Sequence, residues 1–189
     1  MFKQIKTGLV FGSLIIGIFT TGIILPAVAA AKDKIVGTVS SLDESTGTLT
    51  IINNLIEINT NNAKIEKRGL DNATLSDIQE GDIIKITGAA DDAGIIEAIS
   101  IKDPVKLSNK YDGKISGKTE KVNISADTFY IMGQKVDAGN LPGVTMGGRT
   151  ISFDNMRSGV RVDVYVIDKN NQLVAKKMAI RSESCNFCH

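Results

Sequence analysis

The residues with the clearest chemical potential are the last five, Cys185-Asn186-Phe187-Cys188-His189, which hold the only two cysteines and the only histidine of the 189-residue chain. Two thiols three positions apart, with an imidazole directly after the second, form the pattern through which haem is attached covalently to protein. Each thiol adds to one vinyl group of the same rigid macrocycle, and an imidazole nitrogen then binds the iron. The spacing predicts one covalent haem c, bound through Cys185 and Cys188, with His189 as the metal ligand.

The two thiols could also serve a different chemistry. A disulfide closing so short a loop is strained and is usually catalytic, and it normally lies at a helix start in a βαβ fold, which this sequence does not predict. A structural zinc site needs four protein ligands, and the motif offers three. Free, disulfide-bonded or metal-bound thiols would make the chain a thiol redox or metal protein.

The second axial ligand of the iron has to come from another residue type, because the chain has no second histidine. Methionine is the next usual ligand, and it raises the reduction potential. We predict Met146, in a Gly-flanked segment that reads as a flexible loop, with Met132 at a hairpin tip as second choice. The iron could instead bind a lysine amine or the N-terminal amine that cleavage of a leader would create, or its sixth position could stay open.

Two further methionines are predicted to be core residues instead. When the two parts of the body are aligned, Met156 falls on Ile78 and Met178 falls on Ile99. Methionine readily fills such apolar positions. Met132 and Met146 have no obvious apolar counterpart, which is why they are the ligand candidates.

The N-terminus predicts export. Lys3 and Lys6 precede an uncharged apolar run that Pro26 interrupts, and small residues follow at 27–29. This is the form of a signal peptide, which we assign to residues 1–30. The run also approaches the length of a membrane-spanning helix, so a retained anchor is the alternative, and only then would the protein contact a membrane. Either way the rest of the chain is expected in the periplasm, at the cell surface or outside the cell.

Composition excludes several function classes. The chain has 22 Lys and Arg and 21 Asp and Glu residues, and aromatic residues make up 5% with no Trp. This balance gives no electrostatic case for nucleic acid, and stacking platforms for bases are absent. The body between the leader and the last five residues has no His and no Cys, so it offers no nucleophile–base pair. Its turn carboxylates, such as Asp77, Asp82 and Asp91, are expected to bind local backbone. We expect no enzyme.

The body predicts an all-β fold built from two copies of one unit, because period-two alternation dominates and no long helical pattern occurs. The predicted strands of the first copy are 34–40, 48–52, 55–58, 83–87 and 95–101, with one helical turn at 75–82. Those of the second copy are 111–116, 128–131, 135–137, 160–167 and 173–181, with a turn at 153–159. Gly113 is aligned with Gly37, and Gly159 with Gly81. Val160 stands where the first copy has Asp82.

The opening Gly-x-Val, the Leu-x-x-Ile-x-x-Gly-Asp turn and the Asp-x-Gly-Ile-Ile-x-Ala hairpin resemble a family of small secreted β-domains of unassigned function. The resemblance implies two tandem small OB-like β-barrels and an extracytoplasmic setting, but no chemistry. The terminal motif resembles that of c-type cytochromes. The predicted domains are a signal peptide (1–30), barrel 1 (31–106), barrel 2 (107–181) and a short haem-attachment tail (182–189).

The tail raises the question of what covers the haem. A haem is a large apolar plate, and leaving it in water forfeits burial free energy of about 25 cal/mol per Å². Nothing follows His189 in the chain, so the cover is expected from the β-units or, as we favour, from another copy. This predicts a homo-oligomer or filament that carries electrons between redox partner proteins, with haem at a subunit interface. A secreted binding or structural module is the alternative.

Overall fold

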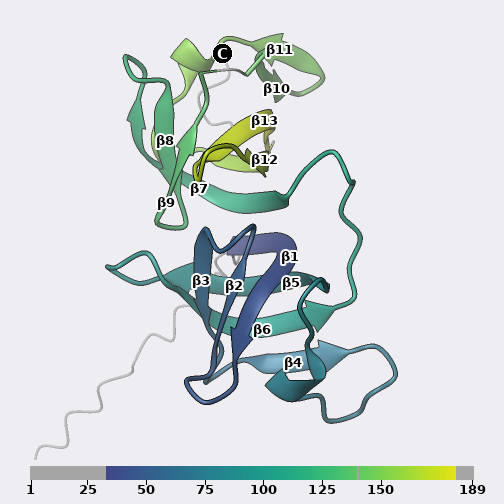
Figure 1. Cartoon of the computed structure of the whole chain (residues 1–189). Coiled ribbons are helices and arrows are strands. Elements are labelled where there is room, and N and C mark those ends of the chain that lie inside the picture. Colours follow the sequence, from purple (N-terminus) through teal and green to yellow (C-terminus); the bar gives the residue numbers. More distant parts are fainter. Residues whose placement is uncertain (1–32, 140, 182–189) are drawn as a thin grey trace, which may run out of the picture. The chain divides into compact units, whose positions relative to one another are not determined.

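The computed structural model describes residues 33–139 and 141–181 (Figure 1). Residues 31–189 cluster into one compact unit, which is described here by itself. The predicted signal peptide at 1–30 and the predicted tail at 182–189 lie outside the described residues, so both stay predictions. Within the described ranges, no helix is long and apolar enough to cross a membrane.

The described residues form an all-β structure, which confirms the all-β part of the predicted fold class. The first half contains β1 (Asp33–Asp43), β2 (Thr48–Ile51), β3 (Ile56–Asn59), β4 (Lys64–Lys67), the 3₁₀ helix η1 (Leu75–Asp77), β5 (Ile83–Ala90) and β6 (Ile96–Asp103). The second half contains β7 (Gly113–Asn123), β8 (Thr128–Ile131), β9 (Gln134–Asp137), β10 (Val144–Met146), β11 (Arg149–Ile151), the 3₁₀ helix η2 (Phe153–Asn155), β12 (Arg161–Asp168) and β13 (Leu173–Ile180).

The core follows from the alternation of the strands. β5 buries Ile84 and Ile86, and β12 buries Val162, Val164 and Val166, while the residues between them lie nearer the surface. Most core residues of the described ranges are Ile and Val, whose branched side chains favour extended backbone and pack well on a pleated surface. The alternation read from the sequence therefore marks the buried face of each long strand.

The strands of the first half close into a five-stranded barrel. β1 pairs with β2, β2 with β3, β3 with β6, β6 with β5, and β5 again with β1. Only the β3–β6 contact in this ring is parallel. Closure satisfies strand edges that would otherwise remain unpaired. β4 is an additional strand, which pairs in parallel with β6 outside the ring.

The strands of the second half pair in the same order. β7 pairs with β8, β8 with β9, β9 in parallel with β13, β13 with β12, and β12 with β7. β10 runs parallel to β13, as β4 runs parallel to β6, and β11 adds one strand beyond β10. Each strand of the first half therefore has a counterpart in the second, while β11 has none.

Backbone hydrogen bonds fix which residues correspond. The N–H of Val39 donates to the Asp82 carbonyl oxygen at 2.9 Å, and the N–H of Thr119 donates to that of Val160 at 2.9 Å. Val39 therefore corresponds to Thr119, and Val160 corresponds to Asp82, as the sequence predicts. Counting back two residues from Val39 and Thr119 matches Gly37 with Gly117. The predicted match of Gly37 with Gly113 is thus wrong by four positions.

The two halves are joined directly by strand pairing between β1 and β7. Ile35 lies opposite Ile115, both are buried, and they occupy corresponding positions. The antiparallel ladder therefore relates the halves by an approximate two-fold axis through this pair. Gly113 pairs with Gly37 across the ladder, and Ile52 packs so close to Gly113 that a side chain there would not fit. The predicted domain boundary at 106/107 falls in the connection between β6 and β7.

The two predicted helical turns are present as short 3₁₀ helices. η1 and η2 begin at Leu75 and Phe153, within the predicted segments. Gly81 and Gly159 follow them with φ of 91° and 88°, in the left-handed region that glycine adopts without a steric penalty. The backbone therefore requires glycine at both positions, which explains why both halves carry it.

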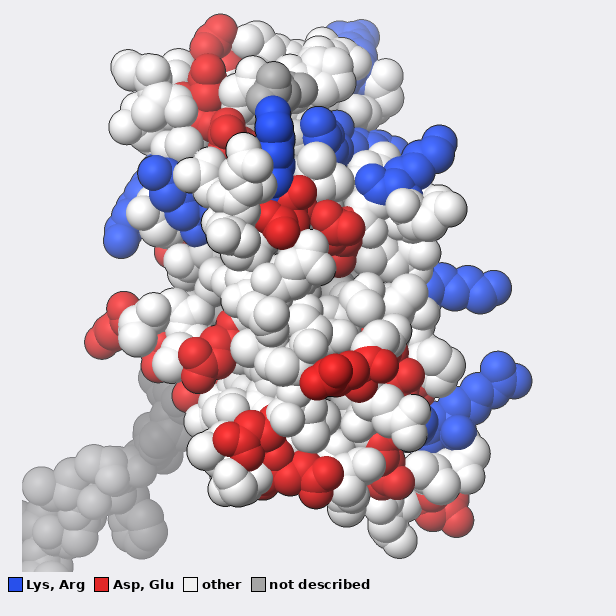
Figure 2. Space-filling view, in the orientation of Figure 1, with Lys and Arg blue, Asp and Glu red and all other residues white. Residues whose placement is uncertain are grey.

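The nearly neutral chain divides into an acidic and a basic half. Residues 33–106 hold 13 Asp and Glu and 7 Lys and Arg, a formal net charge of −6, whereas residues 107–181 hold 7 and 12, a net charge of +5. On the face shown in Figure 2, red groups predominate around β1–β6 and most blue groups lie around β7–β13. The overall balance that the composition gives thus conceals opposite charges on the two halves.

Candidate functional site

The three residues of the predicted haem attachment, Cys185, Cys188 and His189, lie outside the described residues. Their assignment to haem therefore stays a prediction. The structure contributes the surface from which their segment departs.

The departure point is fixed by Arg181, the last described residue. Its backbone N–H donates to the Arg161 carbonyl oxygen at 3.0 Å, which continues the ladder between β12 and β13. Its guanidinium Nε and Nη2 donate to Asp163 Oδ1 at 2.9 and 2.6 Å. The segment that carries the motif therefore begins directly at the end of β13.

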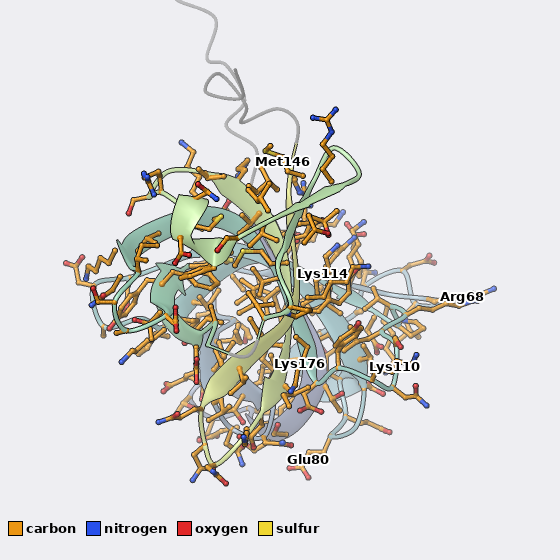
Figure 3. All side chains as sticks on the ribbon, turned by 90° about the horizontal axis from the view of Figure 1, so that it is seen from above. Arg68, Glu80, Lys110, Lys114, Met146 and Lys176 are labelled. Carbon is orange, nitrogen blue, oxygen red and sulfur yellow. The ribbon has the colours of Figure 1, made fainter. Side chains whose placement is uncertain are left out.

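Met146, the predicted second ligand, ends strand β10, so the predicted flexible loop is wrong. It lies opposite Ile180 in β13 and opposite Arg149 in β11. Gly147 and Gly148, with φ of 54° and 82°, form the two-residue turn between β10 and β11. Met146 is half-buried, and Figure 3 shows it at the periphery of the second half. Three-residue strands show too little alternation for the sequence to predict them.

Met146 occupies the position that Lys67 holds in the first half. β4 places Lys67 opposite Asp103, the last residue of β6. β10 places Met146 opposite Ile180, the last residue of β13. Because β4 and β10 have the same parallel partner in their halves, Lys67 corresponds to Met146 and Asp103 to Ile180.

In the first half these positions form an ion cluster of Lys67, Asp82 and Asp103. Lys67 Nζ lies 3.1 Å from Asp82 Oδ2 and 2.8 Å from Asp103 Oδ2, and it donates to the Asp77 carbonyl oxygen at 2.6 Å. The side chain of Asp103 is 2% exposed and that of Lys67 is 24% exposed. The contact between Lys67 and Asp103 Oδ2 is a close ion pair that lacks hydrogen-bond alignment.

The ion cluster favours the charged forms of Lys67 and Asp82. The neighbouring Asp103 carboxylate, assisted by Asp82 and opposed by partial burial, raises the pKa of Lys67 above its ordinary 10.5. Partial burial opposes ionisation of Asp82, but the Gln79 N–H and the Lys67 ammonium outweigh it and hold the pKa of Asp82 below 3.8. Both shifts favour a salt-bridged cluster across the neutral range.

In the second half the corresponding positions hold the apolar residues Met146, Val160 and Ile180, which we call the apolar cluster. All three side chains are half-buried, and Val160 and Ile180 pack against the hydrophobic core. Val160 follows Gly159 as Asp82 follows Gly81. The apolar cluster therefore replaces every charge of the ion cluster with a hydrocarbon or thioether group and leaves part of that surface in contact with solvent.

A cation lies beside the apolar cluster. Arg149 pairs with Met146 across the β10–β11 hairpin, so both side chains project from the same face of that hairpin. Arg149 is exposed, and among the described residues no carboxylate forms an ion pair with it. β11 has no counterpart in the first half, so this cation is an addition specific to the second half.

The end of β13 is held to the sheet by Asp163, which binds Arg181. Burial opposes the charge of Asp163, but hydrogen bonds from Ser116, Arg181 and Lys114 outweigh burial and hold its pKa below the ordinary 3.8. Lys114 Nζ lies 3.1 Å from Asp163 Oδ2. This network keeps Arg181 in place at neutral pH and so fixes the origin of the following segment.

The other methionines of the described body lie in the core. Met156 and Met178 are buried, as predicted, although the alignment of Met178 is corrected by two positions. Val164 pairs with Met178 as Ile86 pairs with Ile101, so Met178 corresponds to Ile101 and not to the exposed Ile99. This correction leaves the predicted core role intact.

Met132 has an apolar counterpart, contrary to the sequence prediction. It follows β8 as Ile52 follows β2, and both residues are buried at positive φ, 50° and 55°. Met132 is 3% exposed and belongs to the core, and it also lines a surface depression beside Gly133. The structure therefore removes the reason for considering Met132 as an axial ligand.

The turn carboxylates bind local backbone, as predicted. Asp77 Oδ2 accepts from the Thr74 N–H at 2.8 Å, Asp82 Oδ2 accepts from the Gln79 N–H at 3.0 Å, and Asp91 Oδ1 accepts from the Ile95 N–H at 2.9 Å. Among the described residues, no group of three or more His, Cys, Asp or Glu side chains is arranged to hold a metal ion.

Two surfaces can be tested for their fit to haem. A depression of about 520 Å³ is lined by Asp33, Asp91, Asp92, Glu120 and other residues. Its carboxylates do not suit an apolar plate that already carries two propionates. The apolar cluster fits better because it offers hydrocarbon, a thioether sulfur and a nearby cation at the origin of the motif's segment.

No family model, curated protein or solved structure matches the chain. The resemblances read from the motifs therefore stay predictions, and the functional argument rests on the chain's own residues.

The sequence singled out one member of the apolar cluster, Met146, as a predicted ligand, and it did not single out Val160, Ile180 or Arg149. The replacement of Asp82 by Val160 was visible as a departure between the two copies. The reason for this replacement depends on the pairing of β10 with β13, and so short a strand shows no alternation in the sequence. The region combines half-buried apolar side chains with the thioether of Met146 at the end of β10.

Proposed function

We propose that this protein is an exported monohaem c-type cytochrome that carries electrons. One observation carries the proposal. The only two cysteines and the only histidine of the chain stand together, in the order and spacing that haem attachment needs, at Cys185, Cys188 and His189. Chance placement would scatter three such residues over the whole sequence.

The chemistry of attachment requires no oxidant. Each cysteine sulfur forms a bond to one vinyl carbon of the haem, and its proton goes to the other carbon of the same vinyl group. Two thioether bonds from Cys185 and Cys188 then fix the macrocycle, and a ring nitrogen of His189 binds the iron. Bound haem supplies one-electron transfer between the ferrous and ferric states. His189 and the tail set its place on the protein.

Met146 is the residue we assign as the second axial ligand. A bis-histidine site is excluded, because each copy of the chain has one histidine and uses it on its own haem. Met146 lies opposite Ile180, beside the origin of the tail, and its thioether would raise the reduction potential. Its place at the end of β10 supports this assignment over Met132, which is buried in the core.

The scaffold of the proposed cytochrome is a pair of tandem OB-like barrels. When β4, β10 and β11 are set aside, each half has five strands in a closed Greek-key order, which is typical of OB-folds. The described body offers no catalytic constellation, so its role is to present the tail. The leader at 1–30 supports export to the periplasm, the cell surface or the medium, where covalent haem attachment would follow transport.

We further propose that copies of the protein associate head to tail. The first half carries −6 and the second half +5, so the acidic half of one copy complements the basic half of the next. Such a contact is heterologous and extends into a filament unless a rotation closes it. The haem on the second half would then lie near a contact between copies, where electrons pass to the next copy or to other redox proteins.

The test of haem attachment is production in a host with haem-maturation machinery. We expect the intact mass of the exported protein to exceed that of the polypeptide by one haem, with a pyridine haemochrome spectrum of the c type. The double variant Cys185→Ala/Cys188→Ala is the control, and it should stay colourless while remaining folded. A colourless wild-type protein with two alkylatable thiols would contradict the proposal.

The test of assembly is sedimentation of the haem-loaded protein at low and high salt. Because exposed charges are screened within about 8 Å at physiological ionic strength, association should weaken as salt rises. Reversing Lys110, Lys118 and Lys169 to glutamate should abolish association at low salt. Association that does not change with salt or with these substitutions would contradict the head-to-tail contact.

A further inference from the structure

The two halves share the backbone arrangement beside their last strands, β6 and β13, but they carry charged side chains there in the first half and apolar side chains in the second. Lys67 forms ion pairs with both Asp82 and Asp103, at 3.1 and 2.8 Å, so the charges at this place in the first half are partnered within the chain. The apolar cluster, at the corresponding positions of the second half, holds no charges at all. Apolar side chains with no role at the surface are expected to be buried in the core. Met146, Val160 and Ile180 are half-buried instead.

Half-buried apolar surface gains free energy when another apolar group covers it. Val160 and Ile180 rest against the core on one side and reach the surface on the other. Met146 lies at the edge of the same surface, opposite Ile180. The counterparts of these three residues in the first half are joined through Lys67. We call the surface of Met146, Val160 and Ile180 the seat.

The segment that can reach this seat is the end of the chain itself. Arg181 is anchored by Arg161 and Asp163, one residue after Ile180. Eight residues follow it, and they can span at most about 26–29 Å when extended. The chain that carries Cys185, Cys188 and His189 thus starts at the seat and has the length to fold back on it.

The chemistry of the seat matches that of a haem on this tail. A haem presents an apolar face and two propionate groups at one edge. The seat presents hydrocarbon from Val160 and Ile180, and Arg149 stands across the hairpin from Met146 as a cation for a propionate. Phe187 of the motif adds a further apolar side chain to the segment.

We propose that the seat formed by Met146, Val160 and Ile180 binds the haem-bearing C-terminal segment of its own chain, with Arg149 pairing a propionate. This inference rests on the proposed function, since it names the surface that covers the haem of that site. The cover comes from the second half of the same copy, and the edge left exposed faces the neighbouring copy.

The test uses trypsin, which cleaves after Arg181 and would release the segment 182–189. The rate of this one cleavage is followed by mass spectrometry in the haem-loaded full-length protein and in the same protein made without haem. We expect haem loading to slow the cleavage on the order of tenfold, which corresponds to about 1.4 kcal/mol of docking free energy. The haem content is measured on the same samples.

Two variants make the test specific. Val160→Asp/Ile180→Asp places the carboxylates of the first half in the seat, and it should abolish the protection while the haem content stays at one per chain. Arg149→Glu changes one exposed residue, so it leaves folding intact, and it should reduce the protection several-fold. Arg68→Glu, at an exposed arginine directly after β4, is the matched control and should leave the protection unchanged.

The outcomes separate the two proposals. Absence of haem from the wild-type protein overturns the proposed function itself. One haem per chain with equal cleavage rates in loaded and unloaded protein overturns the seat and leaves the cytochrome assignment standing. Protection that survives both Arg149→Glu and the double substitution also overturns the seat, because the segment would then be covered elsewhere.

Discussion

The first and second halves of this protein share one strand order but end differently. In the first half, the positions beside the last strand hold Lys67, Asp82 and Asp103 as an ion cluster. In the second half, they hold Met146, Val160 and Ile180 as an apolar cluster. The difference lies where the chain leaves the second half toward its cysteines and histidine.

This difference shows that corresponding positions of one fold can either pair their own charges or expose an apolar surface to a binding partner. An ion cluster satisfies its own charges, and it excludes an apolar partner because desolvating it would be costly. An apolar cluster at the surface gains from being covered. We therefore expect an apolar group such as the proposed haem to be covered by the second half and not by the first.

The largest expected effect comes from breaking the ion cluster. Lys67→Met should destabilise the protein by about 3 kcal/mol, because it leaves Asp103, which is almost fully buried, without its cation. Urea unfolding monitored by circular dichroism measures the change in the free energy of unfolding.

Lys106→Met is the matched control for this substitution. Lys106 is exposed, so its replacement should change the free energy of unfolding by less than about 0.5 kcal/mol. Equal effects of the two substitutions would mean that the ion cluster does not stabilise the first half.

A smaller effect is expected when the whole cluster is exchanged. Lys67→Met/Asp82→Val/Asp103→Ile transfers the apolar trio into the first half. Replacing a buried ion cluster by apolar residues is often neutral or stabilising, so the triple variant should lie within about 1 kcal/mol of the wild type at pH 7. A loss as large as that of Lys67→Met alone would show that the two halves are not interchangeable at this place.

The pH dependence of stability should distinguish the wild type from the triple variant. The folded pKa of Asp82 is below 3.8, so its contribution is present above that pH and is lost as the pH falls through the folded pKa. The folded pKa of Lys67 is above 10.5, so its contribution is complete below that pH and is lost as the pH rises through the folded pKa. Thermal melts should show that the stability of the wild type relative to the triple variant falls below pH 3.8 and above pH 10.5. A difference between the two proteins that stays constant with pH would contradict the charged cluster.

The smallest effect on stability is expected from Met146→Leu. The two side chains have similar volume, so the unfolding free energy of the haem-free protein should change by less than about 0.5 kcal/mol. In the haem-loaded protein the same substitution should lower the reduction potential, because the thioether ligand is lost. Met132→Leu, in the core, is the control and should leave the potential unchanged. An unchanged potential in Met146→Leu would remove Met146 as the ligand.

The sequence predicts the long strands well because their alternation is local. β5, β6, β12 and β13 fall within two residues of the predicted segments at nearly every end. The turns before β5 and β12 are also predicted, because each ends at a glycine, Gly81 or Gly159. These features depend on neighbouring residues, which a single sequence displays.

The sequence does not predict the features that depend on pairing between distant segments. Strands β4, β10 and β11 have only three or four residues, so they show no reliable period. The match of Gly37 with Gly117 and that of Met178 with Ile101 depend on hydrogen-bonded ladders between separate strands. The apolar cluster brings together residues from β10, β13 and the turn before β12, and its chemistry becomes visible only against the ion cluster of the first half.

The central claim is that haem carried by the C-terminal segment rests on Met146, Val160 and Ile180. Methyl NMR of protein shown by mass to carry one haem tests it directly, because unpaired electrons of ferric iron shift and broaden the signals of nearby groups. We predict that the methyl signals of these three residues change between the ferric and ferrous states, while those of Ile65 and Ile84 in the first half do not. Unchanged signals from Met146, Val160 and Ile180 during complete oxidation and reduction of the haem would contradict the claim.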